Sequence, residues 1–172
     1  DLGILFAPNN ISGIFGYTDS DFASCIDSRK STTGYCFKLG NGAISWKSKL
    51  QECTATSTTE AEYIVVSDAA KEALWLSQLT YMFRQAVISS IPIVYNDSQG
   101  VVALSKNLVH QNTSKHINVR YHFVWDCVTS GKLYFEKIST TNNIIDEMPK
   151  CLSINRFRSL RHLMGLRTNR SD

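Results

Sequence analysis

Three acidic side chains stand in the sequence where they could share a metal ion. Asp19 follows a β-branched and aromatic run, and Asp97 follows the apolar run IPIVYN. If these runs form neighbouring parallel strands, the two carboxylates come side by side, and they repel unless a cation lies between them. Glu62 belongs to a long helical pattern that would cover the same edge. Carboxylates without Cys or His favour Mg²⁺ or Mn²⁺, ions that typically act on phosphates.

Each of these acids also has a structural explanation. Glu62 shares its helical stripe with small and apolar residues, so it points toward the sheet, where a lone carboxylate costs free energy. Its partner is then either a metal ion or a Lys or Arg. Asp97 precedes a short helix and could simply cap it. Asp21 shares a face with Asp19 if the strand continues, whereas Asp27 suits the following turn.

The elements that must position these acids follow from hydrophobic periodicity. Strands are predicted at 11–18, 32–39, 43–49, 91–96 and 133–138, and helices at about 58–84, 99–106, 114–129 and 153–164. Asn41-Gly42 is a hairpin turn signal, and Ser57 with Glu60 forms a capping box at the start of the long helix. The order predicts a mixed α/β fold, in which a five-stranded sheet pairs its first and fourth strands in parallel.

Composition narrows the class of protein. The 172 residues are 43% hydrophobic and 19% charged, which suits one globular domain, and the net charge of +3 does not by itself indicate a nucleic-acid binder. Five cysteines without a CxxC pair argue against a disulfide framework and a zinc site. We expect no membrane partner, since no apolar run approaches the length of a membrane span, and no signal peptide, since the N-terminus lacks a basic region followed by an apolar block. The chain begins without Met, so we expect a piece of a longer polypeptide.

Five segments carry a resemblance to a known family. They are GYTDSDFA, DSRKSTTGYCFKLGNGAISWKSKLQ, STTEAEYIVVSDAAKEALWL, IVYNDSQGVVALSKN and SKHINVRYHFVWD. In this order and spacing they resemble the ribonuclease H domain of copia-type retrotransposon Pol polyproteins, from about residue 3 to residue 166. The resemblance implies a ribonuclease H-like fold, with helices on both faces of the five-stranded mixed sheet.

The resemblance also implies a chemistry. Members of the family cut the RNA strand of RNA–DNA hybrids with two Mg²⁺ ions, which Mn²⁺ can replace. Their four carboxylates fall on Asp19, Glu62, Asp97 and Asp146. The segment around Asp146 reads IIDEMPKCL and departs from the family pattern at Pro149 and Cys151. The alternative is therefore a catalytically decayed or host-adopted nucleic-acid-binding domain; another nuclease or transposase on the same fold is a third possibility.

Basic residues supply candidate contacts to nucleic acid. They are Arg29 and Lys30 in the turn after the first strand, and Lys115, His116 and Arg120 on a predicted helix. Surface solvation and helix packing explain the same residues. The chain from Lys150 onward is also basic, which indicates either a phosphate-contacting surface or a solvated helix face.

The resemblance further predicts domains, partners and location. Residues 1–10 would be the connection from the reverse transcriptase side of the polyprotein, 11–150 the ribonuclease H-like domain, and 151–172 a C-terminal helix and basic tail. The expected partners are an RNA–DNA hybrid and the reverse transcriptase domain of the same polyprotein. The expected location is intracellular, in the cytoplasmic virus-like particle of the element.

Overall fold

A five-stranded mixed sheet forms the centre of the molecule. The computed structural model describes residues 2–4, 13–82, 91–100, 115–145 and 153–168. The strands, in spatial order, are β4 (Gly42–Leu50), β3 (Thr32–Leu39), β2 (Ile14–Asp21), β5 (Ile93–Asn96) and β6 (Tyr134–Lys137). The β4, β3 and β2 strands are antiparallel, whereas β2, β5 and β6 run parallel to one another. The predicted parallel pairing of the first and fourth strands is therefore confirmed.

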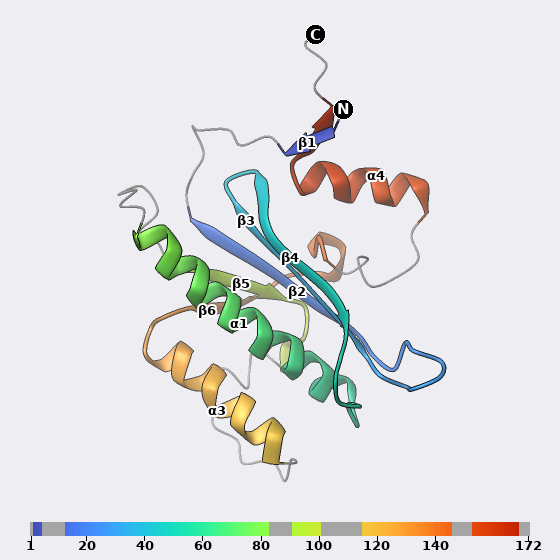
Figure 1. Ribbon diagram of the computed structural model, residues 1–172, viewed down its shortest axis with the longest axis vertical. Coiled ribbons are helices and arrows are strands. Elements are labelled where there is room, and N and C mark those ends of the chain that lie inside the picture. The colour runs from blue at the N-terminus through green and yellow to red at the C-terminus, as the bar shows by residue number, and fades with distance from the viewer. Residues whose placement is uncertain (1, 5–12, 83–90, 101–114, 146–152, 169–172) are drawn as a thin grey trace.

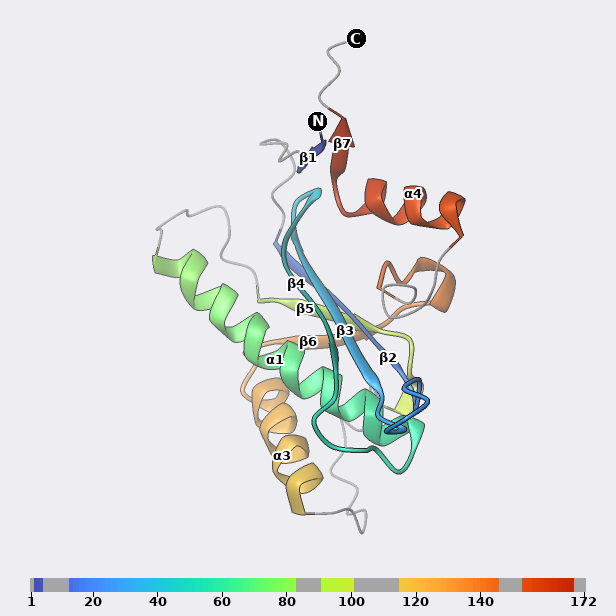
Figure 2. The same ribbon diagram turned by 45° about the vertical axis from the view of Figure 1, so that its right-hand side comes forward.

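Helices cover both faces of this sheet, as the predicted fold class requires (Figures 1 and 2). The helices are α1 (Thr58–Met82), α3 (Lys115–Thr129) and α4 (Ile154–Leu163). Helices α1 and α3 pack on one face, where the larger core cluster lies. Helix α4 packs on the other face over a smaller cluster. The mixed α/β class with a five-stranded sheet is confirmed.

The larger core arises from the alternation of each strand against the apolar stripe of α1. Ile14, Phe37 and Val94 point from three strands into this cluster and are at most 1% exposed. A Cβ atom on Gly16 would lie 2.5 Å from Cε1 of Phe37, so only glycine leaves room for the phenyl ring there. Burial of this face fixes the register of the sheet, because a slip by one residue would expose every core side chain.

The smaller cluster joins α4 to the opposite face. Its buried members are Cys36, Ala43, Ile144, Ile145 and Leu160. Two backbone carbonyls at the end of α4 also bind the β3–β4 hairpin: Met164 O accepts from Ala43 N at 3.0 Å, and Leu163 O accepts from Lys38 Nζ at 2.6 Å. The C-terminal helix is thereby attached to the sheet.

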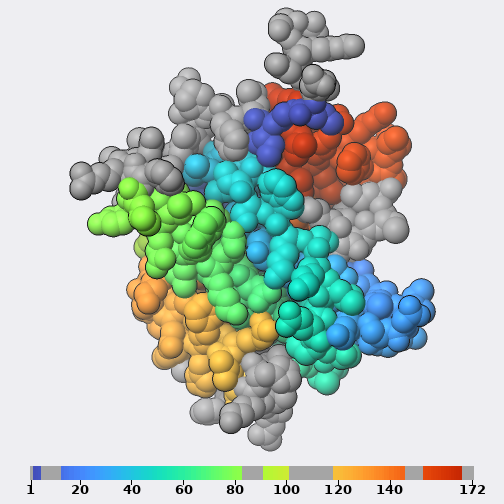
Figure 3. Space-filling view, in the orientation of Figure 1, coloured from blue at the N-terminus to red at the C-terminus, as the bar shows by residue number. Residues whose placement is uncertain are grey.

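Within the described residues, most predicted boundaries agree with the structure to within two residues, and the first strand is the exception. The predicted helix at about 99–106 lies mostly outside the described part of the chain. Strand β2 spans Ile14–Asp21, three residues later than predicted, because pairing with β3 extends it through polar residues. Two short strands were not predicted: β1 (Leu2–Ile4) pairs antiparallel with β7 (Leu166–Thr168). Figure 3 shows β1 against the C-terminal segment on one face of the molecule. A 3₁₀ turn, η2 (Thr140–Asn142), follows β6.

The start of α1 follows its capping prediction with one change. Ser57 Oγ accepts a hydrogen bond from Glu60 N at 3.1 Å, as an N-cap does. The Glu60 carboxylate reaches back to Thr56 N at 2.7 Å, one residue before the cap. Both contacts fix the first turn of α1, and Glu62 follows at the start of the next turn.

The four described cysteines are free. Among the helices of the described ranges, none combines the length and apolar character needed to cross a bilayer.

Candidate metal centre

Asp19 and Asp97 lie directly after the last paired residues of two parallel strands, so they start side by side. The last paired residues of β2 and β5 are Thr18 and Asn96. Beyond them β5 ends and the chain turns away at Asp97, while β2 continues through Asp19 to its end. Ligands bind at such carboxyl ends of parallel strands because the backbone there opens a crevice.

Glu62 of α1 completes a cluster of three carboxylates. One carboxylate oxygen from each of Asp19, Glu62 and Asp97 lies within 4.8 Å of the others. Asp19 is 5% exposed and Glu62 9%, while Asp97 is more open to solvent. Three converging oxygen donors that reach solvent on one side suit a hard divalent cation such as Mg²⁺ or Mn²⁺. The predicted convergence of these three residues is found.

Neutral donors hold the Glu62 side chain. Ser20 Oγ donates to Glu62 Oε1 at 2.7 Å, and Ser20 N donates to the same oxygen at 3.3 Å. Asn96 Nδ2 donates to the second oxygen, Oε2, at 2.9 Å. Among the described residues, no Lys or Arg forms an ion pair with Glu62, so the salt-bridge explanation finds no support there. The carboxylate is oriented but not neutralised.

Burial dominates the electrostatics of Glu62. It raises the pKa of the carboxyl above its usual value, and the nearby negative charge of Asp97 adds to the rise. The hydrogen bonds from Asn96 and Ser20 oppose this shift because they favour the charged form. A cation bound between the three carboxylates would relieve both the burial cost and the mutual repulsion.

Asn96 links the strands to the helix. Its side chain is completely buried, and Nδ2 donates to Thr18 Oγ1 at 3.0 Å as well as to Glu62. Its Oδ1 accepts from Ser98 N at 2.7 Å, which shapes the turn through Asp97. One amide therefore positions two of the three acids.

The segment after β6 supports the site from the other side. Thr140 Oγ1 donates to Asp97 Oδ2 at 3.0 Å. Asn143, which is buried, donates through Nδ2 to Thr18 O at 3.0 Å and accepts from Ile145 N at 3.3 Å. The predicted fourth acid, Asp146, follows Ile145 and lies outside the described part of the chain.

The predicted nucleic-acid contacts have different outcomes. Arg29, exposed and at a φ of +52°, and Lys30 lie in the turn between β2 and β3. Lys115 and His116 open α3, and their side chains lie outside the described part of the structure. Arg120 is bound, because its Nη1 donates to Asp68 Oδ1 at 3.1 Å. The role of all five in binding stays a prediction.

Sequence reasoning missed the neutral residues that orient the acids. They are Ser20, Asn96, Thr140 and Asn143. A signal existed for Ser20 and Asn96. Each is a polar residue on the strand face whose other residues pack against α1. Thr140 and Asn143 lie in a polar run with no such pattern.

Comparisons with known sequences show that the chain is similar to segments of retrotransposon polyproteins. It is 44% identical over 154 residues, 90% of its length, to the retrovirus-related Pol polyprotein from transposon TNT 1-94 of Nicotiana tabacum. It is 36% identical over 167 residues, 96% of its length, to that from transposon RE2 of Arabidopsis thaliana. The chain spans 11% of the length of each of these relatives. No model of a known protein family matches it.

Solved structures share the fold at low sequence identity. The N-terminal RNase H domain of a Mycobacterium tuberculosis protein superposes with a TM-score of 0.57 at 12% identity, covering 87% of this chain and 96% of that one. LC11-RNase H1 in complex with an RNA/DNA hybrid gives 0.52 at 16% identity, covering 76% and 88%. The resemblance stated from the sequence and the predicted fold are both confirmed.

Proposed function

We propose that this chain, which has the ribonuclease H fold and is related in sequence to the Pol polyproteins of copia-type retrotransposons, hydrolyses the RNA strand of RNA–DNA hybrids. The observation that carries the proposal is the convergence of Asp19, Glu62 and Asp97 within 4.8 Å at the carboxyl ends of parallel strands. The shared fold with a ribonuclease solved on an RNA/DNA hybrid supports the choice of substrate.

The proposed cofactor is a pair of Mg²⁺ ions, for which Mn²⁺ can substitute. Asp19, Glu62 and Asp97 would hold them, with Asp146 as the proposed fourth acid. When bound, such ions supply an activated water and stabilise the leaving oxygen. The chain itself contributes orientation: Ser20 and Asn96 fix Glu62, and Thr140 fixes Asp97.

The activity would serve reverse transcription of the element. We propose that the chain acts beside the reverse transcriptase domain of the same polyprotein, inside a cytoplasmic virus-like particle. The sequence relatives support this context, because they are Pol polyproteins of transposons. Fractionation of cells that express the full polyprotein, followed by probing particles for this segment, tests the location.

A cleavage assay tests the activity. We expect the chain to cut an end-labelled RNA strand in an RNA–DNA hybrid when Mg²⁺ is present, and to leave duplex DNA intact. Asp19→Asn removes a proposed ligand and should lower the rate by about a thousandfold, since metal stabilisation of the transition state is worth several kcal/mol. Asp27→Asn is the matched control, because Asp27 is an exposed turn residue.

Two results would decide against hydrolysis. Equal rates for the wild type and Asp19→Asn would show that another site cuts the substrate. Binding of the hybrid without metal-dependent cleavage would instead favour the alternative of a decayed or host-adopted binding domain.

A further inference from the structure

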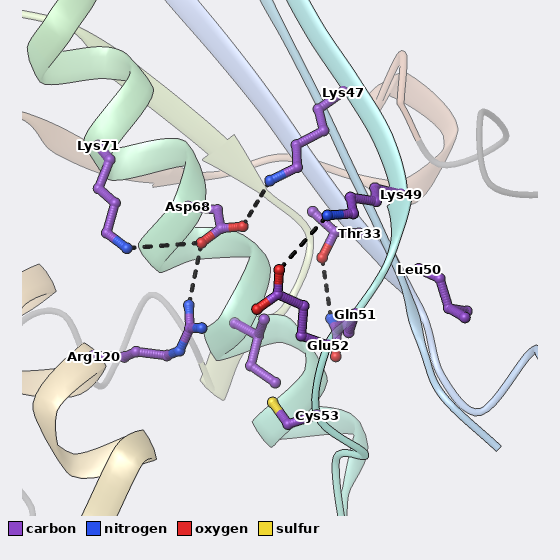
Figure 4. Close-up of a pocket in the computed structure, with 11 residues that line it drawn as sticks. Thr33, Lys47, Lys49, Leu50, Gln51, Glu52, Cys53, Asp68, Lys71 and Arg120 are labelled. Carbon is purple, nitrogen blue, oxygen red and sulfur yellow. Dashed lines mark hydrogen bonds and ion pairs between the residues drawn. The ribbon is translucent and has the colours of Figure 1, made fainter. Parts of the chain in front are cut away.

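A second site lies between β4, α1 and α3, and it shares no residue with the three carboxylates. It is a pocket of about 250 Å³. Figure 4 shows Lys47 and Lys49 reaching in from β4, Asp68 and Lys71 from α1, and Arg120 from α3. Four cationic and two acidic side chains line the pocket, the second acid being Glu52. The lining therefore carries an excess of positive charge.

Asp68 holds three of the cations together. Its carboxylate contacts Lys47 Nζ at 3.0 Å, Arg120 Nη1 at 3.1 Å and Lys71 Nζ at 4.0 Å. Burial raises the pKa of Asp68, but the hydrogen bond and charge of Lys47 and the charge of Arg120 outweigh it, so the pKa lies below its usual value. One carboxylate cannot neutralise three cations, and the remaining charge faces the pocket.

Three of the basic groups have donors available for an incoming anion. Lys71 and Lys49 are each 61% exposed, and Lys49 is held only by the exposed Glu52 at 3.6 Å. Arg120 has five N–H donors and uses one of its nitrogens, Nη1, on Asp68. These groups can turn toward a ligand without giving up a buried contact.

Fixed polar groups also line the pocket. Gln51 is 4% exposed, and its Nε2 donates to Thr33 Oγ1 at 3.2 Å and to Ala61 O at 3.0 Å. These bonds join the end of β4 to β3 and to the first turn of α1. The lysines of β4 and α1 are therefore presented from elements held in a fixed relation to one another.

We infer that this pocket binds a phosphate group of a nucleic-acid duplex, as a second anchor for the substrate. The inference rests on the proposed function for the identity of that duplex. Asp68 lies six residues beyond Glu62 on α1, which is about 9 Å along the helix axis. Each strand of a duplex presents a phosphate about every 3.4 Å along its axis. Six residues also turn the helix by about 240°, so the pocket and the carboxylates lie on different sides of α1, close enough for one duplex to contact both.

Hybrid binding measured without divalent ions tests the pocket separately from cleavage. Lys49→Gln/Lys71→Gln should reduce the slope of log affinity against log salt by about one for each lost phosphate contact, and weaken binding about tenfold per contact at low salt. Lys71→Gln alone should show half of this effect. Lys132→Gln is the matched single-charge control, since Lys132 is an exposed lysine that does not line the pocket.

Asp68→Asn gives a prediction of opposite sign. It removes the carboxylate that competes with phosphate for three cations, so hybrid binding should tighten several-fold and its salt slope should become steeper. If the pocket had only a structural role, this variant would leave the salt slope unchanged or weaken binding through loss of fold.

The outcomes separate the pocket from the proposed activity. Equal affinities and slopes for the wild type and Lys49→Gln/Lys71→Gln overturn the pocket, whether or not the hybrid is cleaved. A reduced slope in this variant, together with no Mg²⁺-dependent cleavage by the wild type, keeps the pocket and overturns the proposed hydrolysis.

Discussion

Two carboxylates of helix α1, Glu62 and Asp68, lie six residues apart in opposite environments. Glu62 receives hydrogen bonds from the neutral groups of Ser20 and Asn96. Asp68 is surrounded by the positive charges of Lys47, Lys71 and Arg120. The pKa of Glu62 is raised, mainly by burial, whereas the cations around Asp68 lower its pKa despite burial.

The difference shows how one helix can offer a negative charge to a metal ion at Glu62 and gather positive charges around Asp68. Neutral donors orient Glu62 but leave its charge available to a cation, which a Lys or Arg in contact would have consumed. Asp68 has its charge already neutralised, and its role is to gather cations beside a pocket. The type of partner, rather than the acid itself, distinguishes a candidate metal ligand from a structural carboxylate.

Exchange of each acid for its amide should give the largest contrast. Glu62→Gln removes a proposed ligand, so Mg²⁺-dependent cleavage should fall by about a thousandfold. Asp68→Asn should retain the cleavage rate at saturating hybrid, since Asp68 does not belong to the carboxylate cluster. Single-turnover cleavage of both variants measures this. Equal losses in the two variants would contradict the division between the sites.

Loss of the neutral partner of Glu62 should affect both stability and activity. Asn96→Ala removes a buried amide that binds Glu62 and Thr18, so the free energy of unfolding should fall by about 2–3 kcal/mol. Urea unfolding measures this loss. Cleavage by the folded fraction should also slow, because Glu62 loses a donor that orients it. Unchanged cleavage per folded molecule would mean that Asn96 serves only the fold.

Removal of Asp68 should cost a stability that depends on pH. Its lowered pKa means that the folded state favours the charged form, so its contribution is present above the unfolded-state pKa of about 4 and is lost as pH falls through the lower folded-state value. Asp68→Asn should therefore be less stable than the wild type by about 1 kcal/mol at neutral pH. Urea unfolding from pH 7 to pH 3 should show this difference shrinking.

Glu62 should show the opposite dependence in metal-free buffer. Its raised pKa means that burial of the charged form destabilises the fold, so wild-type stability should decrease as pH rises from the unfolded-state pKa through the folded-state value. Glu62→Gln lacks this decrease and should be the more stable protein at neutral pH. Added Mg²⁺ should reverse the order by stabilising only the wild type. A variant less stable than the metal-free wild type at every pH would contradict this account of Glu62.

The smallest effect is expected for Lys71. Its ammonium lies 4.0 Å from Asp68 and its side chain is largely exposed, so Lys71→Gln should change the free energy of unfolding by less than about 0.5 kcal/mol. Urea unfolding checks this. A larger loss would show that Asp68 depends on all three cations rather than on Lys47 and Arg120.

The sequence predicted the parts of the fold whose signals are local. Strand β3 has its predicted bounds, since its alternation is a local signal. The turn that follows it is Gly40-Asn41, one residue earlier than predicted, because Gly42 already pairs with Leu39. The direction of Glu62 followed from its helical stripe alone. The extension of β2 was not predictable in this way, because Ser20 and Asp21 resemble a loop and become strand only through pairing with β3.

Contacts between distant segments set the limit of prediction for the site. Thr140 reaches Asp97 across 43 residues, and Asn96 reaches Glu62 across 34. Strands β1 and β7, each of three residues, pair from opposite ends of the described chain. No local pattern encodes such partners, because the packing of the whole fold brings them together.

Anomalous scattering from crystals soaked in Mn²⁺ shows directly whether Asp19, Glu62 and Asp97 bind divalent cations. We expect two peaks about 4 Å apart, in contact with the carboxylates of Asp19, Glu62 and Asp97. Both peaks should weaken or vanish in Glu62→Gln and persist in Asp68→Asn. The absence of any peak at these carboxylates in crystals saturated with Mn²⁺, or peaks only elsewhere, would contradict the proposed metal site.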